Sequence, residues 1–428
     1  MIKATRTQWI KFAVVLALYL IFLVWLRSWL GLVVVPFIFD AYITKKIPWT
    51  WWRKSKNRHV VTVMGWVDAI VFALVAVYFV NLYFFQNYVI PSSSLEKSLL
   101  TGDYLFVSKM SYGPRVPQTP LHMPLAQHTL PFFNCKSYLE HPQWDYKRVK
   151  GLGDVQLNDI VVFNFPAGDT VATGVPNDDV YRLSYGAGKE LAKPVDLASM
   201  TPEQQRVVYD YYYQLGREYL KENPQNFGEI ISRPVDRREN YVKRCVGLPG
   251  QTLEIKDRII YLDGKANKEP DNVQYRYLVK TKRPIPDDLA HELGISKEDM
   301  MMYYTDASVY NMPLTEKAKA GLLARKDIVV SIENTPADDA GGLYPLNMYK
   351  NWTTDNYGPV WIPKKGETVK LTLENLPVYE RPIHAYEGNE LAVKDGKIYI
   401  NGKETDEYTF KICLLYTSPS PRDTERSR

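Results

Sequence analysis

The chain of 428 residues is organised around one short stretch, Val89–Tyr104, which reads VIPSSSLEKSLLTGDY. It begins only four positions after an uncharged apolar run that ends at Phe85, and it contains three consecutive serines, Ser92–Ser94. A serine hydroxyl is a poor nucleophile at neutral pH, so a catalytic serine needs a base and an oxyanion stabiliser. The stretch itself shows no such base, which must therefore come from another part of the chain.

A candidate base lies 149 positions after Ser94, in the segment 241–250, which reads YVKRCVGLPG. Strand alternation places Tyr241, Lys243 and Cys245 on one face of a strand that ends at a Gly/Pro turn. A lysine on an inward face loses hydration, which favours the neutral amine that can act as a general base. The pattern predicts a dyad of Ser94 and Lys243.

These segments resemble the type I signal peptidases, membrane-bound serine endopeptidases that remove signal peptides from exported preproteins. The resemblance is carried by Pro-Ser-x-Ser and Leu-x-x-Gly-Asp at 91–103, Asp-Ile-Val-Val-Phe at 159–163 and Tyr-x-Lys-Arg-x-Val-Gly-Leu-Pro-Gly at 241–250. It implies that Ser94 is the nucleophile and Lys243 its general base. The Ser92 hydroxyl and the Ser94 backbone N–H would form the oxyanion hole, with Tyr241 and Arg244 in support. No metal or cofactor is implied.

The chain departs from the family pattern in a few places. Asn158 stands where the family usually has glycine, although asparagine also tolerates left-handed geometry. Leu95 replaces the usual methionine, and Gln251 replaces an acidic residue. The family's last motif, Gly-Asp-Asn-Arg followed by Ser-x-Asp-Ser-Arg, is absent after Lys411. We therefore expect Arg244 to be left unpaired, and residues 412–428 to be a disordered, non-native tail that weakens activity.

Positive charge is concentrated at the N-terminal end of the chain. Residues 1–59 carry ten Lys/Arg and one acid, Asp40, whereas the remaining residues carry 43 Lys/Arg against 47 Asp/Glu. A nucleic-acid partner is not supported, because it would need a basic surface on the folded domain. Cys135, Cys245 and Cys413 have no metal-ligand spacing, and we expect them to be unpaired core residues.

Three apolar runs precede the serines, at 12–26, 29–43 and 69–85, and the second is broken by Pro36 and Asp40. The basic, tryptophan-rich loop 44–59 belongs on the cytoplasmic side by the positive-inside rule. The last run then exits on the far side, which predicts two or three transmembrane segments in a bacterial inner membrane and a catalytic domain on the periplasmic face. The expected partners are membrane lipid and the signal peptides of preproteins. A cleaved signal peptide is a weaker interpretation of the first run, because it lacks a small-residue cleavage site.

The expected fold is mainly β, a signal-peptidase-like catalytic domain with α+β insertions behind the membrane anchor. The predicted division is an anchor at 1–88, catalytic core at 89–166 and 235–265, insertions at 167–234 and 266–390, a second ribbon at 391–411 and the tail. Thr201, Pro202 and Gln204 signal the start of a helix that runs to Pro224. We also expect short helices near 287–293 and 315–324, a hairpin around 363–366, and ribbons at 253–265 and 391–403, each ending in an Asp-Gly or Asn-Gly turn.

Two alternatives to a signal peptidase remain. Ser94-Leu95-Glu96-Lys97 fits the Ser-x-x-Lys motif of penicillin-binding transpeptidases, but the chain has no Lys-Thr-Gly or Lys-Ser-Gly. The chain could instead be a non-catalytic, membrane-anchored β-rich binding protein in which the serines are a plain linker. Loss of preprotein cleavage in both Ser94→Ala and Lys243→Ala would separate the dyad from both alternatives.

Overall fold

The structure is a computed structural model that describes residues 4–91, 95, 98–130, 132–133, 135–176, 178–270, 272–300, 308–337, 343–412 and 416–417. It divides into two compact units. Unit 1 comprises residues 1–89, 104–154 and 234–238, and unit 2 comprises residues 90–103, 155–233 and 239–428. The serine-bearing stretch and the Lys243 strand both belong to unit 2.

Unit 1 contains two helices that are long and apolar enough to cross a membrane, α1 (Arg6–Leu26) and α3 (Arg58–Tyr83). Thr5 starts α1 with a capping box, in which its hydroxyl accepts from Gln8 N and the Gln8 side chain accepts from Thr5 N. Large apolar side chains stay exposed along both helices, including Val24 and Phe72. Such a surface fits a lipid environment.

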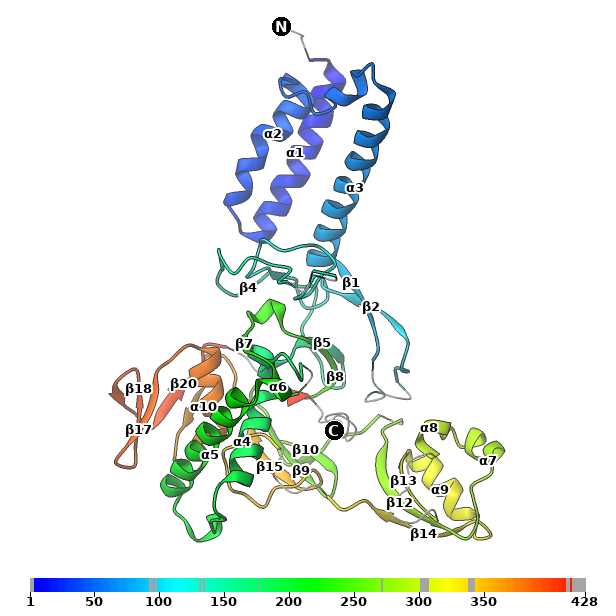
Figure 1. Ribbon diagram of the computed structural model, residues 1–428, viewed down its shortest axis with the longest axis vertical. Coiled ribbons are helices and arrows are strands. Elements are labelled where there is room, and N and C mark those ends of the chain that lie inside the picture. The colour runs from blue at the N-terminus through cyan, green and yellow to red at the C-terminus, as the bar shows by residue number, and fades with distance from the viewer. Residues whose placement is uncertain are drawn as a thin grey trace. The chain divides into compact units, whose positions relative to one another are not determined.

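The second apolar run forms a shorter helical segment at 30–44, made of η1 (Leu30–Val34), α2 (Val35–Phe39) and η2 (Asp40–Thr44). Figure 1 shows α2 alongside α1. The Tyr19 hydroxyl donates to Gly31 O at 2.7 Å, and the Phe39 ring lies 5.4 Å from the Phe12 ring. The segment therefore runs back along α1 and returns the basic loop to the N-terminal end of that helix.

The C-terminal end of α3 leads directly into a hairpin, β1 (Phe85–Val89) and β2 (Tyr104–Ser108). A second small sheet, β3 (Arg115–Val116) with β4 (Lys147–Arg148), packs against the helix ends through Val116 and Val149. These valines contact Leu26 of α1 and Tyr83 of α3. The short helix η7 (Val235–Arg237) completes unit 1.

Unit 2 is built from small antiparallel sheets. β5 (Ile160–Asn164) pairs with β8 (Asn240–Gly247), and β6 (Thr170–Ala172) pairs with β7 (Ile230–Ser232). One ribbon is β9 (Thr252–Lys256), β10 (Ile259–Leu262) and β11 (Lys265–Ala266), and the other is β17 (Leu391–Lys394), β18 (Lys397–Ile400) and β19 (Lys403–Glu404). The expected turns at 263–264 and 401–402 have positive φ at both residues, as a type I′ turn requires. Both predicted ribbons are confirmed.

The largest core of unit 2 lies around these ribbons. Its buried residues include Leu253, Tyr357, Leu376, Ile398 and Phe410. A separate core fills the sheet of β12 (Tyr275–Thr281), β13 (Val309–Leu314) and β14 (Val329–Asn334), against α7 (Asp287–Glu292), α8 (Lys297–Met300) and α9 (Glu316–Ala324). The two short helices expected in this insertion, at 287–293 and 315–324, are therefore confirmed.

The insertion at 167–234 is dominated by helices rather than by a mixture of elements. η5 (Pro166–Asp169) precedes α4 (Val180–Leu191), and η6 (Leu197–Ser199), α5 (Pro202–Glu222) and α6 (Pro224–Phe227) follow. The predicted capping box of Thr201 and Gln204 is present. α4 and α5 pack closely, with Gly188 against the backbone of Tyr212 and Gly216 against that of Ser184.

The structure corrects several expectations. The described part of the chain is not mainly β, because helices hold 37% of its residues and strands 23%; the long helices α1, α3 and α5 outweigh many short strands. The described strands form no closed barrel. The hairpin expected around 363–366 is wrong: β15 (Tyr357–Trp361) pairs with β9, and β16 (Thr368–Lys370) pairs with β20 (Glu407–Thr409).

Part of the expected tail is described. Ile412 N donates to Glu387 Oε1, and residues 416–417 form a two-residue strand, β21, beside β8. This contact contradicts the expectation of disorder for those residues, because the exposed edge of β8 offers backbone partners. The other residues of the tail lie outside the described part of the chain. α10 (Leu376–Arg381) and η9 (Pro382–Tyr386) precede the second ribbon.

Candidate active site

The β8 strand places Lys243 in the interior of unit 2. In the antiparallel register Lys243 lies opposite Val161 of β5. Its residue surface is 8% exposed, and Cys245, two positions along the same face, is fully buried. Alternation along a strand brings the two side chains to one face. The inward position predicted for Lys243 from the sequence is confirmed.

Asn158 turns the chain into β5 with φ of 69°, the left-handed conformation predicted for this position. Its backbone N–H donates to Cys245 O at 2.8 Å, which extends the pairing of the two segments beyond the regular strands. The Asn158 carbonyl accepts a hydrogen bond from Arg244 Nη1 at 2.8 Å. Asn158 is therefore hydrogen-bonded to two consecutive residues of β8, Arg244 and Cys245.

Arg244 also reaches the serine-bearing stretch. Its Nη2 donates to Ser98 Oγ at 3.0 Å, across 146 positions of sequence. The expectation that Arg244 is left unpaired is therefore wrong, because a hydroxyl and a carbonyl of unit 2 accept from its guanidinium. This contact places Ser98, four positions after the last of the three serines, beside Arg244, the residue next to Lys243.

The stretch itself is closed by local hydrogen bonds. At its base, Ile90 N donates to Asp103 O at 3.0 Å and Gly102 N donates to Ile90 O at 2.9 Å. Ile90 and Leu95 are buried, and Leu95 O accepts from Ser98 N at 2.9 Å. The residues on both sides of the serines are thus fixed, whereas Ser92, Ser93 and Ser94 lie outside the described residues.

Tyr241, the other residue expected to support the lysine, stacks on Phe165 with ring centroids 4.5 Å apart and an interplanar angle of 12°. The stack joins the start of β8 to the end of β5. Offset stacking of this kind contributes about 1 kcal/mol beyond area burial. Tyr241 therefore anchors the strand that carries Lys243.

Neither of the described cysteines forms a disulfide. Both are free thiols, as predicted; Cys245 is buried, but Cys135 is exposed, so the expectation that it is a core residue is wrong. Burial raises the pKa of the Cys245 thiol, which keeps it protonated and unreactive at neutral pH. Among the described residues no group of three or more His, Cys, Asp and Glu side chains could hold a metal ion.

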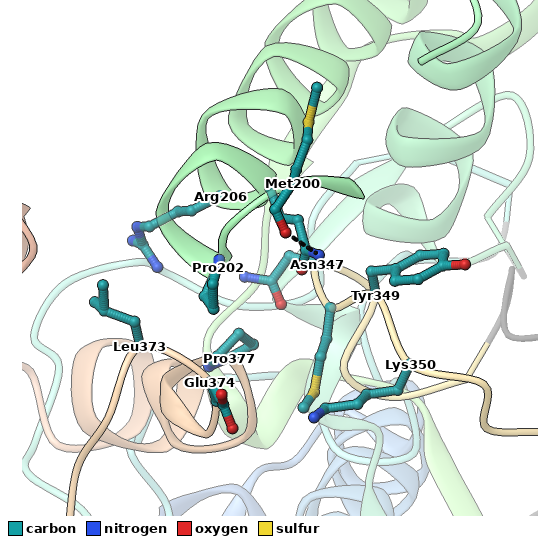
Figure 2. Close-up of a pocket in the computed structure, with 11 residues that line it drawn as sticks. Met200, Pro202, Arg206, Asn347, Tyr349, Lys350, Leu373, Glu374 and Pro377 are labelled. Carbon is teal, nitrogen blue, oxygen red and sulfur yellow. Dashed lines mark hydrogen bonds between the residues drawn. The ribbon is translucent and has the colours of Figure 1, made fainter. Parts of the chain in front are cut away.

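A cavity of about 250 Å³ lies elsewhere in unit 2. It is lined by residues of α5, of the segment 347–350 and of α10, and Gln205 Nε2 donates to Met200 O beside it (Figure 2). None of the predicted site residues lines this cavity. We assign it no chemistry.

Sequence reasoning missed Ser98. The one signal was its spacing, since Ser98 follows Ser94 by four positions and directly precedes Leu99 and Leu100. A polar residue at that place needs a partner. The partner could not be identified from the sequence, because Arg244 is distant along the chain.

Comparison with known proteins places the chain in a family. The model of the family described as signal peptidase, peptidase S26, matches residues 63–294, a range that contains the serine stretch, β5 and β8. The chain belongs to this signal peptidase family. The resemblance inferred from the three motifs is confirmed.

Individual relatives match over shorter ranges. The signal peptidase I of Helicobacter pylori is 42% identical over 56 residues, 13% of this chain and 18% of the relative. Signal peptidase I P of Bacillus subtilis subsp. natto is 27% identical over 103 residues, 23% of this chain and 52% of the relative. The signal peptidase I of Rickettsia prowazekii is 24% identical over 165 residues, 35% and 56% of the two chains. This chain therefore spans between about a fifth and just over half of these relatives. No solved structure matches it.

Proposed function

We propose that this signal peptidase family member is a membrane-bound serine endopeptidase that removes signal peptides from exported preproteins, with Ser94 as nucleophile and Lys243 as general base. The observation that carries the proposal is the hydrogen bond of 3.0 Å between Arg244 Nη2 and Ser98 Oγ. It ties the serine stretch to the residue next to a buried lysine. The family match over residues 63–294 includes both segments.

The proposed reaction is acyl transfer to Ser94 followed by hydrolysis. The neutral amine of Lys243 accepts the Ser94 hydroxyl proton while Oγ attacks the scissile carbonyl carbon. The tetrahedral intermediate then collapses, the peptide C–N bond breaks, and Lys243 returns the proton to the leaving amine. A water molecule, deprotonated by the same amine, hydrolyses the acyl-enzyme and regenerates Ser94.

The negative charge that develops on the carbonyl oxygen needs donors. We assign that role to the Ser92 hydroxyl and the Ser94 backbone N–H, each of which would contribute about 3 kcal/mol to stabilising the transition state. Donors that are fixed before the reaction need no reorganisation during it, and the segment that carries these serines is closed at its base by hydrogen bonds of Ile90 with Gly102 and Asp103. The signal peptide would enter extended and add as a strand beside the site.

The membrane arrangement belongs to the same proposal. The basic loop 44–59 would face the cytoplasm, α3 would carry the chain outward, and unit 2 would act at the outer face of a bacterial inner membrane. The nine positions between Phe85 and Ser94 can span at most about 30 Å, which would hold the nucleophile near the bilayer. A substrate that arrives in the membrane suits this short tether.

The test uses the full chain in proteoliposomes with a preprotein whose mature N-terminus is known. The unaltered protein should cut at that position, and Ser94→Ala and Lys243→Ala should each abolish cleavage. Lys97→Ala is the matched control, since it removes the lysine of the Ser-x-x-Lys motif, and it should leave cleavage unchanged. Failure of the unaltered protein to cut, or retained cleavage in Lys243→Ala, would overturn the proposal.

A further inference from the structure

A group of cationic side chains gathers in unit 1, which contains none of the candidate active-site residues. Arg115 and Arg148 are directly opposite each other in the β3–β4 pair. The charges of Arg115, Arg148 and Arg237 all act on the ammonium group of Lys109. We call these four residues the basic cluster.

The basic cluster lacks matching acids. The carboxylate whose charge acts on Arg115 and Arg237 is that of Asp236, which already accepts from Thr119 N and Thr119 Oγ1, both at 2.9 Å. Burial opposes ionisation of Asp236, but the Thr119 hydrogen bonds and the neighbouring arginines hold its pKa below the usual range. Among the described residues, the Asp236 carboxylate therefore acts on two of the four cations, Arg115 and Arg237.

Arg148 donates to Tyr146 Oη and Gly113 O, and Arg237 donates to Gln127 O and Asp236 Oδ2, but other donors of the basic cluster make no such bond. Among the described residues, neither Lys109 Nζ nor the Arg115 guanidinium makes a hydrogen bond or an ion pair, and both side chains are only half-buried. Arg237 is 5% exposed, and its buried Nε has no hydrogen-bond partner in the described part of the chain. Buried donors of this kind are costly unless a ligand accepts from them.

The electrostatic cost of this arrangement appears at Lys109. Burial, followed by the charges of Arg115, Arg148 and Arg237, lowers the pKa of Lys109 to about 8 from its usual 10.5. An anion placed among these groups would offset the repulsion between them. Binding of an anion would therefore stabilise this arrangement of four positive charges.

The position of the basic cluster narrows the class of anion. Val116 and Val149, the neighbours of Arg115 and Arg148, pack against Leu26 and Tyr83 at the membrane-exit ends of α1 and α3. Trp25 Nε1 donates to Lys150 O at 3.4 Å, and Lys147 Nζ donates to Arg27 O at 2.8 Å. Tryptophan at a helix end marks the level of lipid headgroups. The cluster therefore lies at the depth where phospholipid phosphates are found.

We propose that Lys109, Arg115, Arg148 and Arg237 bind the phosphate of an anionic phospholipid headgroup at the membrane-exit end of α1 and α3. Arginine forks and a lysine ammonium are the groups that proteins use for phosphate, and basic pockets beside transmembrane helices bind such headgroups. The acyl chains would extend along the exposed apolar faces of α1 or α3. This site is independent of the Ser94–Lys243 chemistry.

Native mass spectrometry of the full chain in detergent can test the proposal, with short-chain phosphatidylglycerol, short-chain phosphatidylcholine and inorganic phosphate as the probes. The unaltered protein should retain one phosphatidylglycerol, and Arg115→Gln and Lys109→Met should each weaken that binding at least tenfold. Lys150→Gln is the matched control, because it removes an exposed positive charge next to β4 without touching the cluster, and it should bind normally.

Each other outcome would overturn the assignment. Equal phosphatidylglycerol retention in Arg115→Gln and the unaltered protein would exclude the cluster as the site. Phosphate that competes at the same concentration as the lipid would show a free-anion site, and phosphatidylcholine retained as tightly would show no selectivity for an anionic headgroup. Folding of each variant is checked by its thermal unfolding; Arg115→Gln removes no hydrogen bond seen among the described residues.

Discussion

At the scale of single residues, the candidate site depends on how Arg244 connects two distant segments. Its guanidinium joins the Asn158 carbonyl to the Ser98 hydroxyl, while the preceding residue of β8, Lys243, is buried. Arg244 and Ser98 are positioning residues in this account. In the proposed mechanism they would hold the backbone near the proposed nucleophile without contacting the substrate.

Ser98→Ala should lower kcat/KM for preprotein cleavage about fivefold, because loss of one such hydrogen bond costs about 1 kcal/mol. The fall should be in kcat, with KM little changed, since the loop geometry matters for the reaction more than for substrate binding. Ser199→Ala is the control. It removes an exposed hydroxyl at the end of η6, shortly before α5, and should have no effect. A Ser98→Ala enzyme with unchanged kcat would remove Ser98 from the site.

Lys109 gives a pH prediction with a definite sign. Because its pKa is about 8 in the folded protein and 10.5 in the unfolded chain, the unfolded state binds more protons between these values. The free energy of unfolding should therefore rise with pH from about 8 to about 10.5. In lipid-free detergent this rise should be absent from Lys109→Met, as measured by denaturant unfolding at several pH values; parallel pH curves for the two proteins would contradict it.

The sequence predicts single residues well where local pattern decides them. Alternation along 241–247 is sufficient to place Lys243 inward, and the left-handed turn at Asn158 follows from the residue type. The partner of Arg244 could not be predicted, because it depends on how two segments 146 positions apart meet. The same limit applies to the basic cluster, in which Arg148 and Arg237 are distant along the chain from Lys109 and Arg115.

At the scale of elements, the insertion at 167–234 contains one long helix that the sequence predicts and one that it does not. α5 was predictable because Thr201, Pro202 and Gln204 form a complete start signal. α4 was not, because Gly186 and Gly188 resemble a loop. Gly188 is required by tertiary contact: a Cβ there would lie 1.8 Å from Tyr212 O of α5.

The two glycines of α4 should respond oppositely to alanine. Gly188→Ala should destabilise the α4–α5 pair by about 2 kcal/mol through overpacking. Gly186→Ala, where a Cβ meets nothing within 4 Å, should stabilise the helix by about 0.5 kcal/mol. Hydrogen exchange of the amides in 180–222 measures both; equal protection in the two variants would contradict the close crossing.

At the scale of the whole molecule, the path of the anchor can be tested with the chain's own thiols. Cys135 is exposed in unit 1 beyond α3, whereas Cys245 is buried. In spheroplasts of a Cys413→Ser variant, a membrane-impermeant maleimide should label Cys135 from outside. Thr50→Cys, added with Cys135→Ser, should react only after permeabilisation. Labelling of Thr50→Cys in intact cells would reverse the proposed orientation.

Sequence patterns predicted the anchor and the order of the three motifs, but they overestimated strand content. The mainly β expectation rested on turns and short alternating runs, and these say little about the long helices that occupy the anchor and the insertion. The returning segment at 30–44 was left open by the sequence because Pro36 and Asp40 interrupt it. Asp40 is accommodated there by hydrogen bonds from the Thr44 hydroxyl, Lys46 N and Trp49 Nε1.

The joint action of Ser94 and Lys243 is tested most directly by a double-mutant cycle on kcat/KM for preprotein cleavage. If the two side chains form one catalytic unit, removing the second after the first costs almost nothing. Ser94→Ala with Lys243→Ala should then be as slow as either single variant. Losses that add on a free-energy scale would contradict a dyad and leave the two residues with separate roles.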